Sequence, residues 1–243
     1  MFMDEIVTPK NYSLPIFAIN SSNDFPISFM GSCFPICYQG RIWIITAKHI
    51  LTNHGYRADQ IAVPVKANCS EYFQFVEAAT HDIPDAPDLA DVVIFRVDSA
   101  TTALSQDNTR DIFDFDNESA DATKETFFAI HGFPNELNAV DYDDGTSTRQ
   151  GIILETTSPQ ESEFAGCGSI DLLRNGQLSD ANGFSGGPVF EMDRETMKPT
   201  RLLGVLVRGS TSRMHFARTD VIRSLISTVL TSQLKVSSAN TSC

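Results

Sequence analysis

The 243-residue sequence has little positive charge. It contains 18 Lys and Arg against 31 Asp and Glu, which gives a formal net charge of −13 at pH 7 and a sequence pI near 4.7. Binding of a phosphate backbone or of an anionic lipid surface requires clustered cations. We therefore expect neither a nucleic acid nor a membrane among its partners.

Long apolar runs are also missing. No stretch approaches the roughly 20 residues that cross a bilayer. Residues 1–5, Met-Phe-Met-Asp-Glu, lack the basic region and apolar core of a secretory signal, so none is expected. An apolar share of 42% with 20% charged residues indicates a globular chain, long enough for one large domain or two small cores.

Cysteines are few and show no metal-binding or redox spacing. Their number is odd and no Cys-X-X-Cys motif occurs. Two of them four residues apart on one strand would be about 13 Å apart, too far for a disulfide. Reduced thiols and a cytoplasmic location are the simplest interpretation. The five are Cys33, Cys37, Cys69, Cys167 and Cys243.

A glycine-rich stretch at 183–189 has the sequence Gly-Phe-Ser-Gly-Gly-Pro-Val. So much glycine indicates a tight, uncovered turn rather than the interior of a helix or strand. Such a turn exposes the Ser185 hydroxyl and aims the N–H groups of Gly183 and Ser185 at one point, where an oxyanion would form. The plainer interpretation is a turn before a strand. As a nucleophile, Ser185 requires a base and an acid that orients the base.

The candidate base follows a predicted hairpin. Residues 27–38 and 41–46 are rich in β-branched and aromatic side chains and are separated by the turn residues 39–40, which predicts two antiparallel strands. The second strand leads directly to His49. A rigid strand fixes the position of a side chain at its end, so we take His49 as the candidate base.

The candidate acid is Asp91, which directly precedes the apolar run 92–97. A carboxylate at the mouth of a buried strand is held by backbone N–H groups and shielded from water, as an orienting acid requires. Asp88 begins a similar pattern and is the alternative. We prefer Asp91, because the pattern that starts at Asp88 would bury a second charged residue.

These segments resemble the motifs of chymotrypsin-like (trypsin-fold) serine peptidases. Residues 183–188 match Gly-X-Ser-Gly-Gly-Pro, residues 46–49 match Thr-Ala-X-His, and residues 91–98 resemble Asp-Leu-Ala-Val-Leu-Lys-Val-Asp. The order base, acid, nucleophile along the chain is also that of this family. The resemblance implies an all-β fold of two consecutive six-stranded antiparallel β-barrels with a C-terminal α-helix.

Domain boundaries follow from this expectation. The segment 219–230 has apolar residues at the i, i+3/i+4 spacing of an amphipathic helix. The resemblance implies that this helix docks on the second barrel. The expected units are an N-terminal arm at 1–15, a first barrel at 16–105, a connection at 106–125, a second barrel at 126–218 and the helix at 219–235.

The resemblance also implies roles for residues around the cleft. Val207, Arg208 and Gly209 would line it, and Ser179 would lie at the base of the primary pocket. No carboxylate would then select a basic substrate residue there, although Asp180 is adjacent. Arg208 would instead favour an acidic substrate residue, together with Arg213 and His215.

Two other parts of the sequence resemble functional sites, a second histidine and an acidic loop. His131 follows a strand-like stretch and is a rival base, but the family has a Gly-X-Pro turn here, so we interpret it as structural. Residues 141–145, Asp-Tyr-Asp-Asp-Gly, resemble the start of a calcium loop. Ile152 stands where that loop needs Glu, so an acidic turn is the better interpretation. We expect no metal site and no cofactor.

Two departures point away from the secreted digestive enzymes. Phe184 occupies the position where those enzymes have an aspartate, and disulfides are missing around His49. In both respects the sequence resembles intracellular bacterial trypsin-like peptidases more than the secreted enzymes. The expected function is a serine endopeptidase that cleaves a protein or peptide substrate, has a narrow range and has a dedicated partner protein. The alternatives are an inactive binding module on the same fold and a metal-dependent hydrolase.

Overall fold

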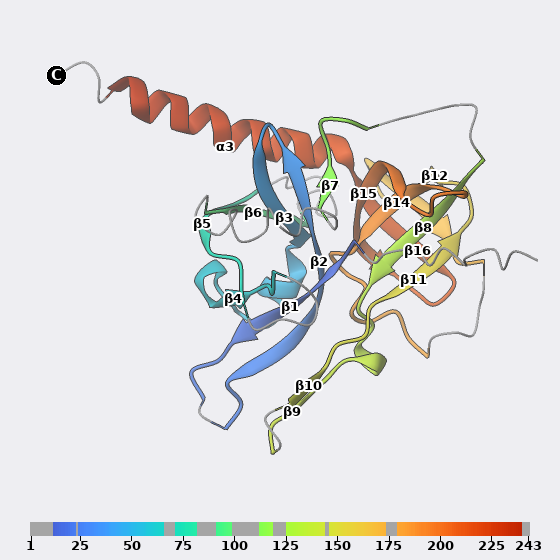
Figure 1. Cartoon of the computed structure of the whole chain (residues 1–243), viewed down its shortest axis with the longest axis horizontal. Helices are drawn as coiled ribbons and strands as arrows, with labels where there is room; N and C mark the ends of the chain where they lie inside the picture. The colour runs from blue at the N-terminus through green and yellow to red at the C-terminus, as the bar shows by residue number, and fades with distance from the viewer. Residues whose placement is uncertain are drawn as a thin grey trace, which may run out of the picture.

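The computed structural model of the chain describes residues 12–22, 24–65, 71–81, 91–98, 112–118, 125–143, 146–173 and 179–239. Within these ranges the protein consists mainly of antiparallel strands in two curled sheets, with one long helix near the C-terminus (Figure 1). This is the all-β architecture that the sequence predicts.

The first sheet is formed by six antiparallel strands in the order β4-β1-β2-β3-β6-β5. It curls into a barrel, because a bridge between Pro64 and Tyr72 joins the chain beyond β4 to the chain before β5. A short strand, β7 (Phe113–Asp114), pairs in parallel with β2. The strands are β1 (Leu14–Ile19), β2 (Ile27–Tyr38), β3 (Arg41–Ala47), β4 (Ile61–Ala62), β5 (Phe75–Thr80) and β6 (Val92–Val97).

The second sheet has the order β11-β8-β14-β15-β16-β13-β12. A bridge between Thr156 and Leu172 joins the ends of β11 and β13 and closes six of these strands into a second barrel. The strands are β8 (Thr126–Gly132), β11 (Ile152–Thr156), β12 (Gln160–Glu161), β13 (Cys167–Asp171), β14 (Pro188–Asp193), β15 (Pro199–Gly209) and β16 (Arg213–Arg218).

The hairpin predicted at 27–46 is confirmed. Gln39 and Gly40 between β2 and β3 have positive φ values of 50° and 66°. Positive φ at both central residues is the geometry of the two-residue turn that matches the twist of paired strands. A further hairpin, β9 (Ala139–Asp141) and β10 (Thr146–Thr148), contacts the first barrel, where the Tyr142 hydroxyl donates to the Ile27 carbonyl at 2.6 Å.

One hydrophobic cluster joins the two barrels. It contains Phe34 and Trp43 of the first barrel with Phe190 and Val205 of the second, all fully buried. The interior of each barrel has a separate cluster of its own. Because the shared cluster lies between the barrels, their relative position is fixed by close packing.

The helix α3 (Thr219–Ala239) begins where the sequence predicts and continues beyond residue 235. Its apolar face is buried in the shared cluster: Ile222 and Ile226 have no exposed surface, and Leu225 has 1%. The helix contacts β15 and β16 and also β5 and β6, so it packs on both barrels rather than on the second alone.

Arg223 links α3 to the segment 112–118, which lies in the predicted connection between the barrels. Its guanidinium lies 3.9 Å from the centre of the Phe115 ring, and its Nη2 is 3.0 Å from Oε2 of Glu118. Within the described residues, no helix has both the length and the apolar composition needed to cross a membrane.

Candidate active site

His49 and Asp91 form a close pair. The ring Nδ1 of His49 lies 2.6 Å from Oδ2 of Asp91, and the His49 backbone amide donates to Oδ1 at 2.7 Å. The amide of Lys48 also donates to the Asp91 carbonyl, at 3.1 Å. The side chains are 31% and 18% exposed, respectively. Both side chains are therefore partly shielded from solvent.

The register of two strands explains this contact. β3 and β6 pair antiparallel with Ala47 opposite Val92. The residue before β6 is Asp91, and it faces the chain that leaves β3 toward His49, the first residue of α1 (His49–Thr52). Asp88, the alternative acid, lies outside the described residues.

Ser185 lies in a turn anchored on both sides. The preceding Phe184 is 1% exposed and packs in the core of the second barrel. The amide of Gly186 donates to the Leu206 carbonyl at 2.8 Å, and the Ser185 carbonyl accepts from the Ser32 amide at 3.1 Å. The turn needs glycine at 183 and 186, where φ is +93° and +82°.

Hydrogen bonds on the carbonyl groups orient the peptide units of the turn. The Asn182 carbonyl accepts from the Asn135 amide at 2.8 Å, so the Gly183 N–H of the same trans peptide points the opposite way. The Gly183 carbonyl accepts from the Ser32 hydroxyl at 2.6 Å. Neither Gly183 nor Ser185 donates its amide to any group in the described part of the chain.

The turn that carries Ser185 is packed against the residues around His49. A Cβ added at Gly186 would lie 3.0 Å from the Ala47 nitrogen and 2.1 Å from the Thr46 hydroxyl. Gly31 is also close to this turn: a Cβ added there would lie 3.3 Å from the Ser185 carbonyl oxygen and 3.3 Å from Cδ1 of Ile50. Among the described contacts, however, no hydrogen bond joins Oγ of Ser185 to the His49 ring. The structure therefore brings together His49 and Asp91, with Ser185 on the adjoining turn.

His131, the rival base, is fully buried. Its Nδ1 accepts from the Tyr12 amide at 3.0 Å, and its ring packs edge-on against Phe190 with the centroids 5.3 Å apart. Burial lowers the pKa of His131 from 6.5 to about 3. A ring without access to solvent and held by Tyr12 has a structural role, as the sequence predicts.

The three residues predicted to line the cleft form the C-terminal end of β15. Val207 is buried in the shared cluster, so only its main chain is left for a substrate. Arg208 is exposed and its guanidinium lies 4.5 Å from the centre of the Phe164 ring. Gly209 is exposed, and a Cβ there would lie 2.5 Å from Sδ of Met214.

The other pocket candidates have partners of their own. Ser179 is exposed, and both its amide and its hydroxyl donate to Oε2 of Glu136. Arg213 forms a two-bond ion pair with Asp171, at 2.6 and 3.1 Å.

The remaining two are also hydrogen-bonded. Nδ1 of His215 lies 2.9 Å from the Ser162 hydroxyl, and His215 is only 9% exposed. Asp180 accepts from the backbone and side chain of Asn182. The assignment of Ser179 to the base of a primary pocket stays a prediction, since residues 174–178 before it lie outside the described ranges.

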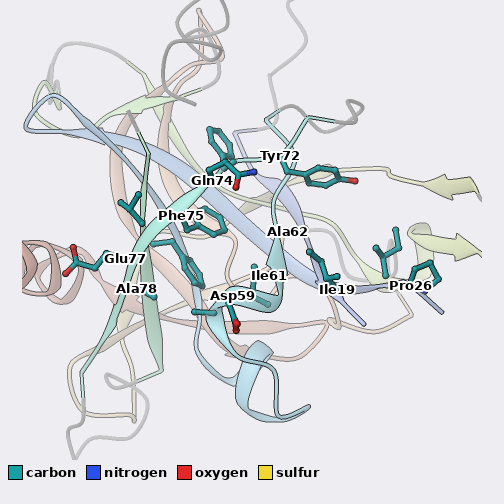
Figure 2. A pocket seen from close by; sticks show the side chains of 15 residues that line it. Ile19, Pro26, Asp59, Ile61, Ala62, Tyr72, Gln74, Phe75, Glu77 and Ala78 are labelled. Atoms are coloured by element: carbon teal, nitrogen blue, oxygen red, sulfur yellow. The ribbon is translucent and has the colours of Figure 1, made fainter. Parts of the chain in front are cut away.

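A groove of about 710 Å³ lies on the first barrel, away from these residues (Figure 2). Its walls include Ile19, Tyr72, Phe75 and Glu77, and none of the candidate catalytic residues lines it. Across the described residues, no group of three or more His, Cys, Asp and Glu side chains is placed to hold a metal ion.

No protein-family model and no curated protein sequence matches the chain. A solved structure of a mutant of human heparin-binding protein (CAP37) matches it with a TM-score of 0.51 and 14% identity, over 91% of this chain and 92% of that one. At this identity the likeness shows the fold alone. The fold is the double β-barrel of chymotrypsin-like proteins, with a C-terminal helix.

The sequence analysis does not identify two residues that hold the turn of Ser185 or the segment before it. Ser32 donates to the Gly183 carbonyl and accepts from the Phe133 amide at 2.8 Å, and Glu136 binds Ser179. Neither belongs to a motif, and each acts on a residue far away in the chain. No local sequence signal identifies them.

Proposed function

We propose that the chain is a serine endopeptidase that hydrolyses peptide bonds through an acyl-enzyme intermediate. The observation that carries the proposal is the 2.6 Å contact between Asp91 and Nδ1 of His49, beside a glycine turn that carries the partly exposed Ser185. A ring that donates from Nδ1 to a carboxylate leaves Nε2 to accept a proton.

In the proposed reaction, Oγ of Ser185 attacks the carbonyl carbon of the scissile peptide and its proton passes to Nε2 of His49. The N–H groups of Gly183 and Ser185 stabilise the oxyanion, and Asp91 stabilises the imidazolium. The intermediate collapses as His49 returns the proton to the leaving amine. Water then attacks the acyl group by the same route and restores Ser185.

The missing hydrogen bond between Ser185 and His49 is compatible with this mechanism. Such bonds are often long or poorly aligned in a free enzyme and tighten when substrate binds. The turn of Ser185 also packs directly against Thr46 and Ala47, which precede His49 in the chain.

The decisive test is labelling with an organophosphonate, which reacts with an activated serine. We expect stoichiometric labelling at Ser185, no labelling of Ser185→Ala, and full peptidase activity in the presence of a metal chelator. A folded wild-type protein that resists the probe would contradict the proposal and leave a binding module on this fold. Activity abolished by the chelator would favour a metal-dependent hydrolase instead.

The substrate preference belongs to the same proposal. Cleavage of a peptide library distinguishes a preference for basic residues, supported by Asp180, from a preference for acidic residues, supported by Arg208. A strict apolar preference would contradict both.

We further propose that the enzyme is cytoplasmic, of the intracellular bacterial type, and narrow in range with a dedicated partner protein. Cys33, Cys37 and Cys167 are free thiols, and an apolar Phe184 stands before the nucleophile. A non-zymogen peptidase in a cytoplasm must be selective to be tolerated. Rapid degradation of casein by the purified protein alone would contradict the narrow range.

A further inference from the structure

A short turn from the second barrel holds the segment before the nucleophile at two points. This turn is the 3₁₀ helix η3 (Asn135–Leu137). Its first residue, Asn135, donates its amide to the Asn182 carbonyl at 2.8 Å. The next residue, Glu136, accepts from the Ser179 amide at 3.0 Å and from the Ser179 hydroxyl, both at Oε2.

The held segment behaves as one unit. Oδ1 of Asp180 accepts from the Asn182 amide at 2.8 Å, and Oδ2 accepts from the Asn182 side chain at 3.2 Å. These bonds close a turn from Asp180 to Asn182, directly after Ser179. An anchor at Ser179 therefore also restrains Asn182 and the peptide that follows it.

That peptide carries the Gly183 N–H, the first of the two proposed oxyanion donors. Gly183 has no room to shift toward η3, because a Cβ there would lie 2.3 Å from the Phe133 carbonyl and 2.7 Å from the Asn135 nitrogen. The direction of its N–H depends on the Asn182 carbonyl staying on Asn135. Donors that stabilise a transition state must be aimed before the reaction occurs.

The holding turn is itself rigid. Asn138 is 8% exposed and donates to the Pro134 carbonyl at 2.6 Å and to the Gln150 carbonyl at 3.1 Å. Its Oδ1 accepts the Gln150 amide at 2.8 Å. With η3 fixed at this end, Glu136 provides a firm attachment for Ser179.

We propose that Glu136 is a positioning residue, which acts through Ser179 to hold the Gly183 N–H toward the oxyanion site. This inference rests on the proposed function. Glu136 does not touch the reacting atoms; it restrains the segment whose last peptide supplies a donor. A carboxylate that accepts two hydrogen bonds from one residue is suited to this role, because it fixes both the backbone and the side chain.

The test compares Glu136→Ala and Glu136→Gln with the wild type. We expect Glu136→Ala to lower both kcat and the rate of organophosphonate labelling about 10-fold, as for loss of one net hydrogen bond, with little change in KM. Glu136→Gln keeps an amide oxygen for Ser179 and should restore most of the rate. Glu195→Ala, an exposed acid in the turn after β14, should behave as wild type.

Amide hydrogen exchange gives a readout that does not depend on activity. Glu136→Ala should speed exchange in the segment 179–187 and leave the thermal midpoint nearly unchanged, because Glu136 is exposed. Exchange equal to wild type, or labelling at the wild-type rate, would overturn the inference. A wild-type protein that is never labelled would instead refute the proposed function, and exchange would still decide whether Glu136 holds this segment.

Discussion

Asp91 binds His49 at two atoms: one carboxylate oxygen lies 2.6 Å from the ring Nδ1 and the other accepts the backbone amide at 2.7 Å. The backbone bond fixes where the carboxylate sits, and the ring bond fixes how the imidazole is turned. A carboxylate at Nδ1 favours the tautomer that carries its proton there. Nε2 is then the basic nitrogen.

Replacing Asp91 with Asn should lower kcat by roughly 10⁴, a magnitude taken from the chymotrypsin-like triad itself. The new amide group can present its NH₂ to Nδ1, which then selects the wrong tautomer. Hydrolysis of a small activated ester by the purified variant measures the effect. Asp143→Asn, an exposed acid in the turn between β9 and β10, is the matched control. If Asp91→Asn kept wild-type kcat, the acid would have to be sought elsewhere, with Asp88 first.

Gly183→Ala should lower kcat roughly 10²- to 10³-fold, the usual cost of losing one oxyanion donor. The added Cβ would lie 2.3 Å from the Phe133 carbonyl, so the turn must move and its N–H turns away. Gly40→Ala is a sharp control, because Gly40 also has positive φ but nothing within 4 Å of its Cβ position. Equal losses in both variants would show that backbone strain, not the donor, is responsible.

Stability should fall as the solution becomes acidic because of His131. Its pKa is about 3 in the folded protein and near 6.5 when unfolded, so the unfolded chain binds the extra proton. The contribution is complete above pH 6.5 and is lost progressively below it. Between pH 7.5 and 5.5 the free energy of unfolding should drop by about 1.4 kcal/mol from this group.

Urea unfolding at the two pH values measures this change. His131→Phe should remove the drop, although the loss of the Tyr12 bond lowers its stability at both values. His54→Gln, which alters an exposed histidine, should keep the drop. If the free energy of unfolding of His131→Phe fell by the same amount between the two pH values, groups other than His131 would be responsible.

Ile226→Ala should destabilise the protein by about 2–5 kcal/mol, because it leaves a cavity in the cluster shared by both barrels. Ile19→Ala deletes the same atoms from a side chain that is 47% exposed and should cost far less. Urea unfolding curves provide both values. A small loss at Ile226 would mean that α3 is loosely packed.

The sequence predicts the framework well where the signal is local. The β2–β3 hairpin follows from β-branched residues around Gln39 and Gly40, and α3 follows from its apolar spacing. The pairing of His49 with Asp91 is also foreseen, since His49 closely follows one strand, Asp91 directly precedes another, and strands fix the positions at their ends. The catalytic roles themselves stay predictions.

What the sequence does not predict is set by contacts between distant segments. Ser32 and Gly183 are 151 residues apart, and nothing near Ser32 in the sequence marks it as a partner of the turn that carries Ser185. Likewise, amphipathic spacing predicts a buried face for α3 but not that this face covers two barrels. Such contacts depend on how the sheets pack, which no short pattern encodes.

Ser32 belongs to β2 of the first barrel, yet its hydroxyl supports Gly183 and Phe133 of the second. The segment that contains Ser185 therefore takes part of its shape from the other half of the molecule. If the gene were split between the barrels, the downstream fragment would have the serine without that support. Recovery of function on mixing the two fragments would then report their association directly.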